Sequence, residues 1–146
     1  MCIRDRIETV AESGAVVIAG GGGGIPVERQ ADGTRTGVQA ILDKDLTSAL
    51  MANVMQIDTM MILTAIDAVR IHYGTENEKA LGNVSCAELK QHFVAGEFSQ
   101  GSMGPKVEAS ISFIEGGGKR AIIAHLEDAT RALKGECGTQ VTTDQP

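Results

Sequence analysis

A short apolar run that ends in five consecutive glycines constrains the fold of this chain most strongly. Residues 15–19 read Ala-Val-Val-Ile-Ala, and glycines occupy positions 20–24. β-Branched apolar residues that give way to glycine predict a buried strand that leads into a loop. Because glycine loses more conformational freedom on folding than any other residue, five together indicate backbone N–H groups that face another molecule, most often an anion. The alternative, a flexible linker, is disfavoured because such linkers are rich in serine.

The composition of the chain excludes several classes of binding partner. The chain has 146 residues, of which 42% are hydrophobic, with one tyrosine, three phenylalanines and no tryptophan. This is enough for one domain with an aliphatic core. A net charge of −6 argues against a nucleic-acid partner, whose phosphates require a basic surface. No apolar run has the length of a membrane span, so we expect no membrane partner.

The cysteines and histidines give no metal motif. Three cysteines are scattered without a Cys-x-x-Cys pair, and the three histidines lie far apart. This pattern is typical of neither a disulfide framework nor a zinc site. We therefore predict no metal site held by protein side chains, and a reducing, cytoplasmic setting.

Helices and strands are predicted to alternate along the chain. Strands are expected over 15–19, 59–64, 68–73, 120–124 and 139–143. Helices are expected over 7–13, 43–55, 85–93, 105–115 and 127–134. A hairpin is expected to join 25–29 to 36–42 through Asp32-Gly33, and a loop is expected over 75–83. This alternation predicts an α/β three-layer sandwich with a mainly parallel sheet covered on both faces. No internal linker divides residues 7–146, which we expect to form a single domain. Residues 1–6 are interpreted as a non-native or truncation-derived start.

Two lysines stand where helices are expected to begin. Lys44 lies in an Asp-Lys-Asp segment, and Lys106 closes a Gly-Ser-Met-Gly-Pro-Lys segment. A lysine in the first turn opposes the helix dipole, and an anionic ligand would compensate for it. For Lys44, a solvated lysine between two capping aspartates is an equal alternative; for Lys106, the alternative is an ordinary Gly-Pro turn into a helix. Together with the glycine loop, the two lysines favour phosphate binding at helix N-termini.

The same residues favour phosphate chemistry, and if they form a phosphoryl-transfer site it has an architecture other than the two common phosphate-binding motifs. The chain has no G-x-x-x-x-G-K-[ST] segment, and Ile25 stands where G-x-G-x-x-G requires its last glycine. A phosphoryl-transfer protein mostly positions groups and neutralises charge. We therefore assign Lys44 and Lys106 to the transferring phosphoryl oxygens and Asp45 to their orientation, and we expect Mg²⁺ to accompany the nucleotide.

Several segments closely resemble carbamate kinase, a branch of the amino acid kinase superfamily. They are Ala-Gly-Gly-Gly-Gly-Gly-Ile-Pro-Val at 19–27, Ala-Ile-Leu-Asp-Lys-Asp-Leu at 40–46, Ile-Leu-Thr-Ala-Ile-Asp-Ala-Val at 62–69, Gly-Ser-Met-Gly-Pro-Lys-Val-Glu-Ala at 101–109, and 120–129 followed by Gly-Thr at 138–139. The resemblance implies an amino acid kinase-like fold and reversible phosphoryl transfer between ATP with carbamate and ADP with carbamoyl phosphate, in arginine degradation. An inactive ADP/ATP-binding module and another small-acid kinase of the superfamily are the alternatives.

The resemblance also implies roles for individual residues. It places Lys44 and Asp45 at the transferring phosphoryl group and Lys106 at the nucleotide phosphates, which makes these three the candidate catalytic residues. The candidate nucleotide-binding residues are Thr64, Ala65, Asp67, Tyr73, Ser102, Met103 and Lys106. The loop expected beside carbamoyl phosphate consists of Gly21, Gly22, Gly23 and Gly24.

The resemblance extends over only the C-terminal half of the family's chains, which are about twice as long. The N-terminal half of the family carries a Gly-Gly-Asn loop and a further lysine for the acyl substrate. We therefore expect a truncated domain that is inactive alone, with an uncovered sheet edge and an exposed apolar surface. Full-length members are expected to form homodimers.

Overall fold

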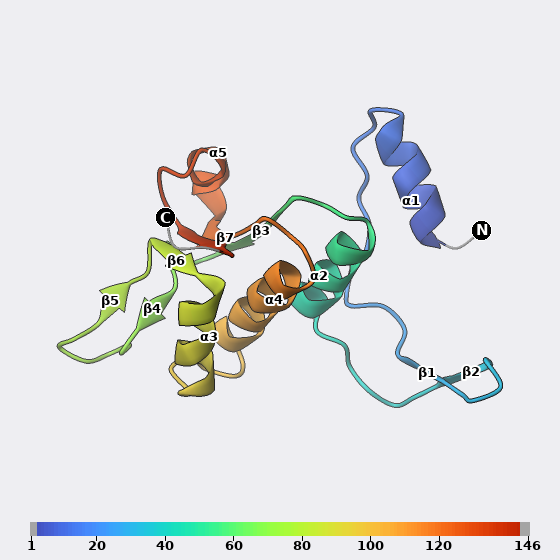
Figure 1. Cartoon of the computed structure of the whole chain (residues 1–146), viewed down its shortest axis with the longest axis horizontal. Coiled ribbons are helices and arrows are strands. Elements are labelled where there is room, and N and C mark those ends of the chain that lie inside the picture. Colours follow the sequence, from blue (N-terminus) through green and yellow to red (C-terminus); the bar gives the residue numbers. More distant parts are fainter. Residues whose placement is uncertain (1–2, 144–146) are drawn as a thin grey trace.

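A four-stranded sheet lies at the centre of the computed structural model, which describes residues 3–143 (Figure 1). Its strand order is β3 (Thr59–Thr64), β7 (Arg120–His125), β8 (Thr139–Thr142) and β6 (Asn83–Ser85). β3 is parallel to β7 and β6 is parallel to β8, whereas β7 and β8 are antiparallel. The predicted α/β fold with a mainly parallel sheet is confirmed, with one antiparallel pair at its centre.

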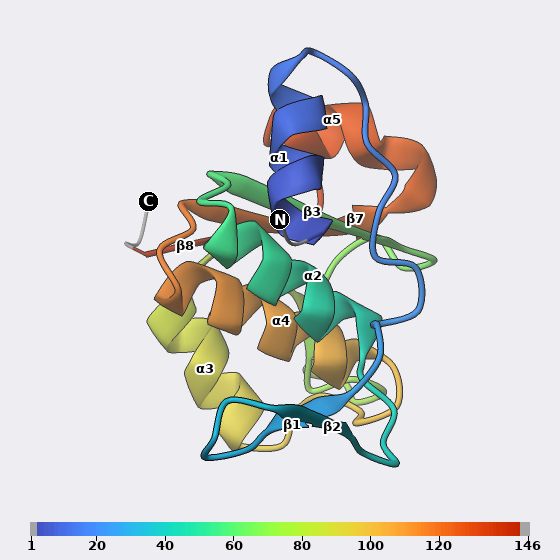
Figure 2. The same cartoon turned by 90° about the vertical axis from the view of Figure 1, so that its right-hand side faces the viewer.

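Helices cover both faces of this sheet (Figures 1 and 2). On one face lie α2 (Lys44–Val54), α3 (Cys86–Val94) and α4 (Met103–Glu115). The side chains of Leu89 from α3 and of Val107 and Phe113 from α4 are fully buried in the core. On the other face, Ile122 and Ala124 pack against Ala132 of α5 (Ala129–Leu133). The helix predicted over 127–134 is divided there into a 3-10 turn, η1 (Leu126–Asp128), and α5.

Polar caps fix where the helices begin, as the sequence predicts. Asp43 Oδ1 accepts hydrogen bonds from the backbone N–H groups of Asp45 (2.7 Å) and Leu46 (3.2 Å) at the start of α2. Ser85 Oγ accepts from the backbone N–H of Glu88 (3.1 Å) at the start of α3. These bonds satisfy N–H groups that have no partner within the first helical turn.

The predicted strand over 15–19 is wrong. This segment is irregular, and the side chains of Val16 and Ile18 are 96% and 99% exposed. A strand requires a neighbour that accepts its hydrogen bonds and covers its side chains, and no strand within residues 3–143 pairs with this segment. The helix before it, α1 (Ile3–Glu12), starts earlier than expected and includes residues 3–6 of the supposed non-native start; residues 1–2 lie outside the described residues.

Two small hairpins complete the fold. The hairpin predicted around Asp32-Gly33 is confirmed as β1 (Val27–Arg29) and β2 (Arg35–Gly37), and it projects from the body of the molecule (Figure 1). The strand predicted over 68–73 is reduced to β4 (Arg70–Ile71), which pairs with β5 (Lys79–Ala80). β5 lies inside the segment predicted as a loop, and so does the first residue of β6, because strands of two or three residues are too short to show a period.

Candidate active site

The first turns of α2 and α4 meet at one cluster of charged side chains. Lys44 and Asp45 open α2, and Lys106 lies in the first turn of α4. Lys106 Nζ donates a hydrogen bond of 2.8 Å to Asp45 Oδ2, and Lys44 Nζ lies 3.8 Å from the same oxygen. The structure therefore brings the three predicted catalytic residues together from two separate helices.

The two lysines of this cluster differ in exposure. The side chains of Lys106 and Asp45 are 15% and 10% exposed, whereas that of Lys44 is 61% exposed. The two ammonium groups balance the carboxylates of Asp45 and of Asp43, which caps α2, and the dipoles at the two helix N-termini favour an anion. The cluster can thus bind a phosphate, with Lys106 held in place and Lys44 accessible from solvent.

The glycine loop is attached to the start of α2 through Thr47. Thr47 Oγ1 lies 2.9 Å from the carbonyl oxygen of Gly23 and 2.9 Å from that of Asp43. Gly23 is buried with a φ of +103°, and a Cβ there would lie 2.2 Å from the carbonyl oxygen of Leu42. Only glycine fits this position. The loop residues Gly21, Gly22 and Gly24 are exposed, with open space around them.

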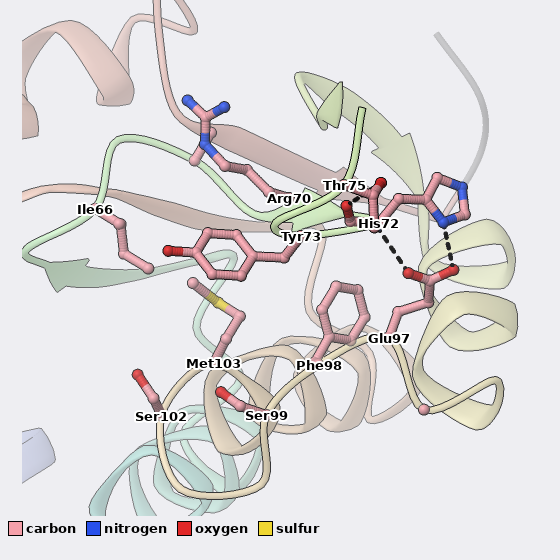
Figure 3. Close-up of a pocket in the computed structure, with 12 residues that line it drawn as sticks. Ile66, Arg70, His72, Tyr73, Thr75, Glu97, Phe98, Ser99, Ser102 and Met103 are labelled. Carbon is pink, nitrogen blue, oxygen red and sulfur yellow. Dashed lines mark hydrogen bonds and ion pairs between the residues drawn. The ribbon is translucent and has the colours of Figure 1, made fainter. Parts of the chain in front are cut away.

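A pocket of about 610 Å³ opens at the start of α4 (Figure 3). The predicted residues Tyr73, Ser102 and Met103 line it, and the ring of Tyr73 extends across it above Met103. Ser102 is the residue before α4, and its side chain makes no capping hydrogen bond. Because Met103 and Lys106 share the first turn of α4, the pocket adjoins the charged cluster.

Four predicted nucleotide-binding residues, Thr64, Ala65, Asp67 and Lys106, do not line this pocket in the described part of the chain. Thr64 ends β3, and Ala65 and Asp67 lie in the segment that follows, whose Ile66 and Ala68 do line the pocket. Asp67 Oδ2 instead accepts a hydrogen bond of 2.9 Å from Arg70. Burial raises the pKa of Asp67, but the hydrogen bond and charge of Arg70 outweigh it and hold this pKa below its ordinary value.

Sequence reasoning missed several residues that shape the pocket. His72 and Thr75 come from the β4–β5 hairpin, and Glu97, Phe98 and Ser99 come from the segment between α3 and α4. No motif marks these positions, because they meet only when the hairpin packs against that segment. The preceding Gly96, with a φ of +78° after α3, is the one sequence signal of a sharp turn there.

The described residues give no metal or membrane signal. Within residues 3–143, no three histidine, cysteine, aspartate or glutamate side chains gather closely enough to hold a metal ion. In the same part of the chain, every helix is too short or too polar to cross a membrane.

A sheet flanked by helices whose N-termini gather two lysines and a carboxylate beside a pocket has the features of a phosphate-binding domain. Residues 3–125 match the amino acid kinase family, and the chain belongs to that family. It is 51% identical to the carbamate kinase of Pyrococcus horikoshii over 138 residues, which are 94% of this chain and 44% of that protein. It is 49% identical, with the same coverage, to the carbamate kinase of Staphylococcus haemolyticus.

Solved structures agree with these relatives. The carbamate kinase from Giardia lamblia bound to AMP-PNP superposes with a TM-score of 0.89 and 38% identity, over 97% of this chain and 49% of that chain. The predicted resemblance and fold are therefore confirmed. The chain spans less than half the length of these relatives.

Proposed function

We propose that this chain supplies the nucleotide-binding and phosphoryl-transfer part of a carbamate kinase. The reaction would be reversible phosphoryl transfer between ATP with carbamate and ADP with carbamoyl phosphate, in arginine degradation. The observation that carries the proposal is the cluster of Lys44, Asp45 and Lys106 at two helix N-termini, beside a pocket of about 610 Å³. This volume lies within the range of small-molecule sites, and the similarity to carbamate kinases supports the substrate.

In the direction of ATP synthesis, an oxygen of the ADP β-phosphate attacks the phosphorus of carbamoyl phosphate. The bond between phosphorus and the carbamate oxygen breaks, and carbamate leaves with the electron pair. Negative charge spreads over the transferring phosphoryl oxygens. The ammonium groups of Lys44 and Lys106 would stabilise that charge, and Asp45 would hold Lys106 in position through its 2.8 Å hydrogen bond.

The remaining predicted residues would bind the two substrates. The side chains of Tyr73 and Met103 would contact the nucleotide base. The hydroxyl of Ser102, which makes no capping hydrogen bond, would donate to a phosphate. The segment that holds Thr64, Ala65 and Asp67 would form the rim. Backbone N–H groups of Gly21–Gly24 would face carbamoyl phosphate.

Magnesium would enter this site with the nucleotide. The carboxylate of Asp45 is already occupied by two lysines, and no metal-holding cluster lies within residues 3–143. The described side chains therefore offer no cage for Mg²⁺, which in such sites is bound largely by substrate phosphates and water. None of the roles given to the protein residues depends on the ion.

A chimaera tests the proposal directly. We would replace the matching segment of the Pyrococcus horikoshii carbamate kinase with this chain and measure ATP formation from ADP and carbamoyl phosphate. We expect activity, and we expect Lys44→Ala to lower kcat by about 100-fold or more, the usual cost of removing one electrostatic contact to a transition state. Lys119→Ala, which removes a 73% exposed lysine paired with Asp58, serves as the control. Unchanged turnover in Lys44→Ala would overturn the role given to Lys44.

A nucleotide-binding module without catalysis is the second candidate. It is favoured by the open space around Gly21, Gly22 and Gly24, since no second wall faces this loop in the described chain. Calorimetry with ADP on the 146-residue chain, together with the assay of the chimaera, distinguishes the two candidates. ADP binding with an inactive chimaera supports the module, whereas an active chimaera supports the kinase; absence of binding by a folded chain contradicts both. Phosphorylation of acetylglutamate or aspartate by the chimaera, but not of carbamate, would indicate another small-acid kinase.

We also propose a reducing, cytoplasmic setting and a homodimer for the whole protein. The support for the setting is that Cys86 and Cys137 are unpaired thiols, as is usual in reducing compartments. The support for the homodimer is the resemblance to carbamate kinase. Sedimentation of the chimaera measures its oligomeric state.

A further inference from the structure

His72 has a backbone conformation that residues other than glycine rarely adopt. Its φ is +54°, and Gln56 is the one other non-glycine residue with a positive φ in residues 3–143. Such a conformation persists only where the surrounding contacts determine it, and it often occurs at binding sites. We therefore looked for the contact that holds His72.

The carboxylate of Glu97 contacts the backbone N–H and one ring nitrogen of His72. The backbone N–H of His72 donates to Glu97 Oε2 at 2.8 Å, and its ring Nδ1 lies 3.1 Å from Glu97 Oε1 (Figure 3). The side chain of Glu97 is 19% exposed, so this contact is partly shielded from water. The left-handed conformation places the backbone N–H and the ring on the same side, where one carboxylate can bind both.

This contact fixes the residue that follows His72. Tyr73 is 75% exposed, so burial does not hold its ring over the pocket. The backbone on both sides of Tyr73 is held instead, because the N–H of Gly74 donates to Glu78 at 2.9 Å and the N–H of Thr75 donates to the carbonyl oxygen of His72 at 3.1 Å. Of the two carboxylates in this arrangement, only Glu97 lies outside the hairpin, and it ties the hairpin to the segment before α4.

We infer that Glu97 is a positioning residue that holds Tyr73 over the pocket and so prepares the pocket for the flat base of a nucleotide. This inference rests on the proposed nucleotide site. Without Glu97, the hairpin would keep its internal hydrogen bonds but lose these two polar contacts with the segment before α4. The ring of Tyr73 would then occupy its position over Met103 for a smaller fraction of the time, and ligand affinity would fall by the same factor.

The intrinsic fluorescence of the protein reports on this inference directly. Tyr73 is the single tyrosine of the chain, which has no tryptophan. In Glu97→Ala we expect stronger quenching of tyrosine fluorescence by acrylamide, and a Kd for ADP raised about tenfold, which corresponds to about one-tenth occupancy of the bound geometry. Glu97→Gln keeps one oxygen acceptor and should give intermediate values. Glu76→Ala, which removes an exposed glutamate of the same hairpin, is the matched control.

The outcomes separate this inference from the proposed function. If the unaltered chain binds ADP and Glu97→Ala changes neither quenching nor Kd, the positioning role is overturned. If the unaltered chain does not bind ADP, the proposed function fails, whereas the quenching comparison still decides the role of Glu97. If circular dichroism shows that Glu97→Ala does not fold, Glu97→Gln and His72→Ala test the same contact, and unchanged quenching in both would overturn it.

Discussion

Asp45 contacts both lysines of the candidate active site, so its charge determines how they are arranged. Its carboxylate is 10% exposed and accepts the hydrogen bond from Lys106. A shielded carboxylate between two cations costs desolvation energy, which the two opposite charges offset. The sequence identified these residues because each stands at the start of a predicted helix. It could not show that Asp45 pairs more closely with Lys106 than with the adjacent Lys44.

Asp45→Asn should lower activity without unfolding the protein. Asparagine keeps an oxygen acceptor for Lys106 but removes the charge, so the two ammonium groups repel each other and the first turn of α4 loses its anchor. We expect kcat for ATP synthesis in the chimaera to fall by about 10- to 100-fold, in line with the loss of one charged positioning contact. The matched control is Asp58→Asn, which removes the charge of an exposed aspartate paired with Lys119. Equal effects of the two substitutions would contradict a special role for Asp45.

Gly23→Ala should destabilise the protein, whereas Gly22→Ala should not. At Gly23 a Cβ would lie 2.2 Å from the carbonyl oxygen of Leu42, and φ is +103°. Gly22 has open space around it and no positive φ. We expect urea unfolding to show a loss of about 1–3 kcal/mol for Gly23→Ala and less than about 0.5 kcal/mol for Gly22→Ala. Similar losses in both variants would show that the loop is not anchored at Gly23.

At the scale of elements, helices were easier to predict from the sequence than strands. The starts of α2 and α3 follow from the local side chains of Asp43 and Ser85, which form the predicted capping bonds. The strand expected over 15–19 has the right residue types but no partner in the described chain, and pairing is a property of two segments. For the same reason the pocket was only partly predicted: Glu97 and His72 meet through packing that no local pattern records.

The β4–β5 hairpin carries a pH-sensitive contact between Asp67 and Arg70. Arg70 lowers the folded pKa of Asp67 below its unfolded value, so this contact stabilises the protein above the unfolded pKa and is lost as pH falls through the folded one. We expect NMR titration to show Asp67 protonating at a lower pH than an ordinary aspartate, and Arg70→Gln to move the midpoint upward. The effect on global stability should be small, because the Asp67 side chain is 63% exposed. An unchanged midpoint in Arg70→Gln would contradict the pairing.

At the scale of the whole molecule, the described chain exposes several large apolar side chains. They include Val16, Ile18, Ile41, Leu50 and Leu63. Apolar groups of this size on a surface are a site of association when they are contiguous. Exposed apolar side chains are what the predicted uncovered surface requires, and that surface stays a prediction. It could be predicted because the resemblance covers less than half the length of the relatives.

Leu50→Gln should reduce self-association while leaving the fold unchanged. Leu50 lies on α2 and is 65% exposed, so its replacement removes no core contact. We expect light scattering and binding of an apolar dye to decrease. The free energy of unfolding should change by less than about 0.5 kcal/mol. Ala49→Gln, at a fully buried position of the same helix, should instead unfold the chain. If Leu50→Gln leaves both scattering and dye binding unchanged, this part of α2 is not the associating surface.

The hydroxyl of Thr47 has a consequence for how the protein can be engineered. It lies within 2.9 Å of both Gly23 and Asp43, the two ends of the segment that forms the β1–β2 hairpin. Thr47 therefore holds the base of the hairpin, whatever the length of the loop at the hairpin tip. Each doubling of the length of a flexible loop costs only about 0.6 kcal/mol. A peptide tag or a reporter inserted between residues 30 and 34 should therefore leave the positions of the glycine loop and the lysine cluster unchanged.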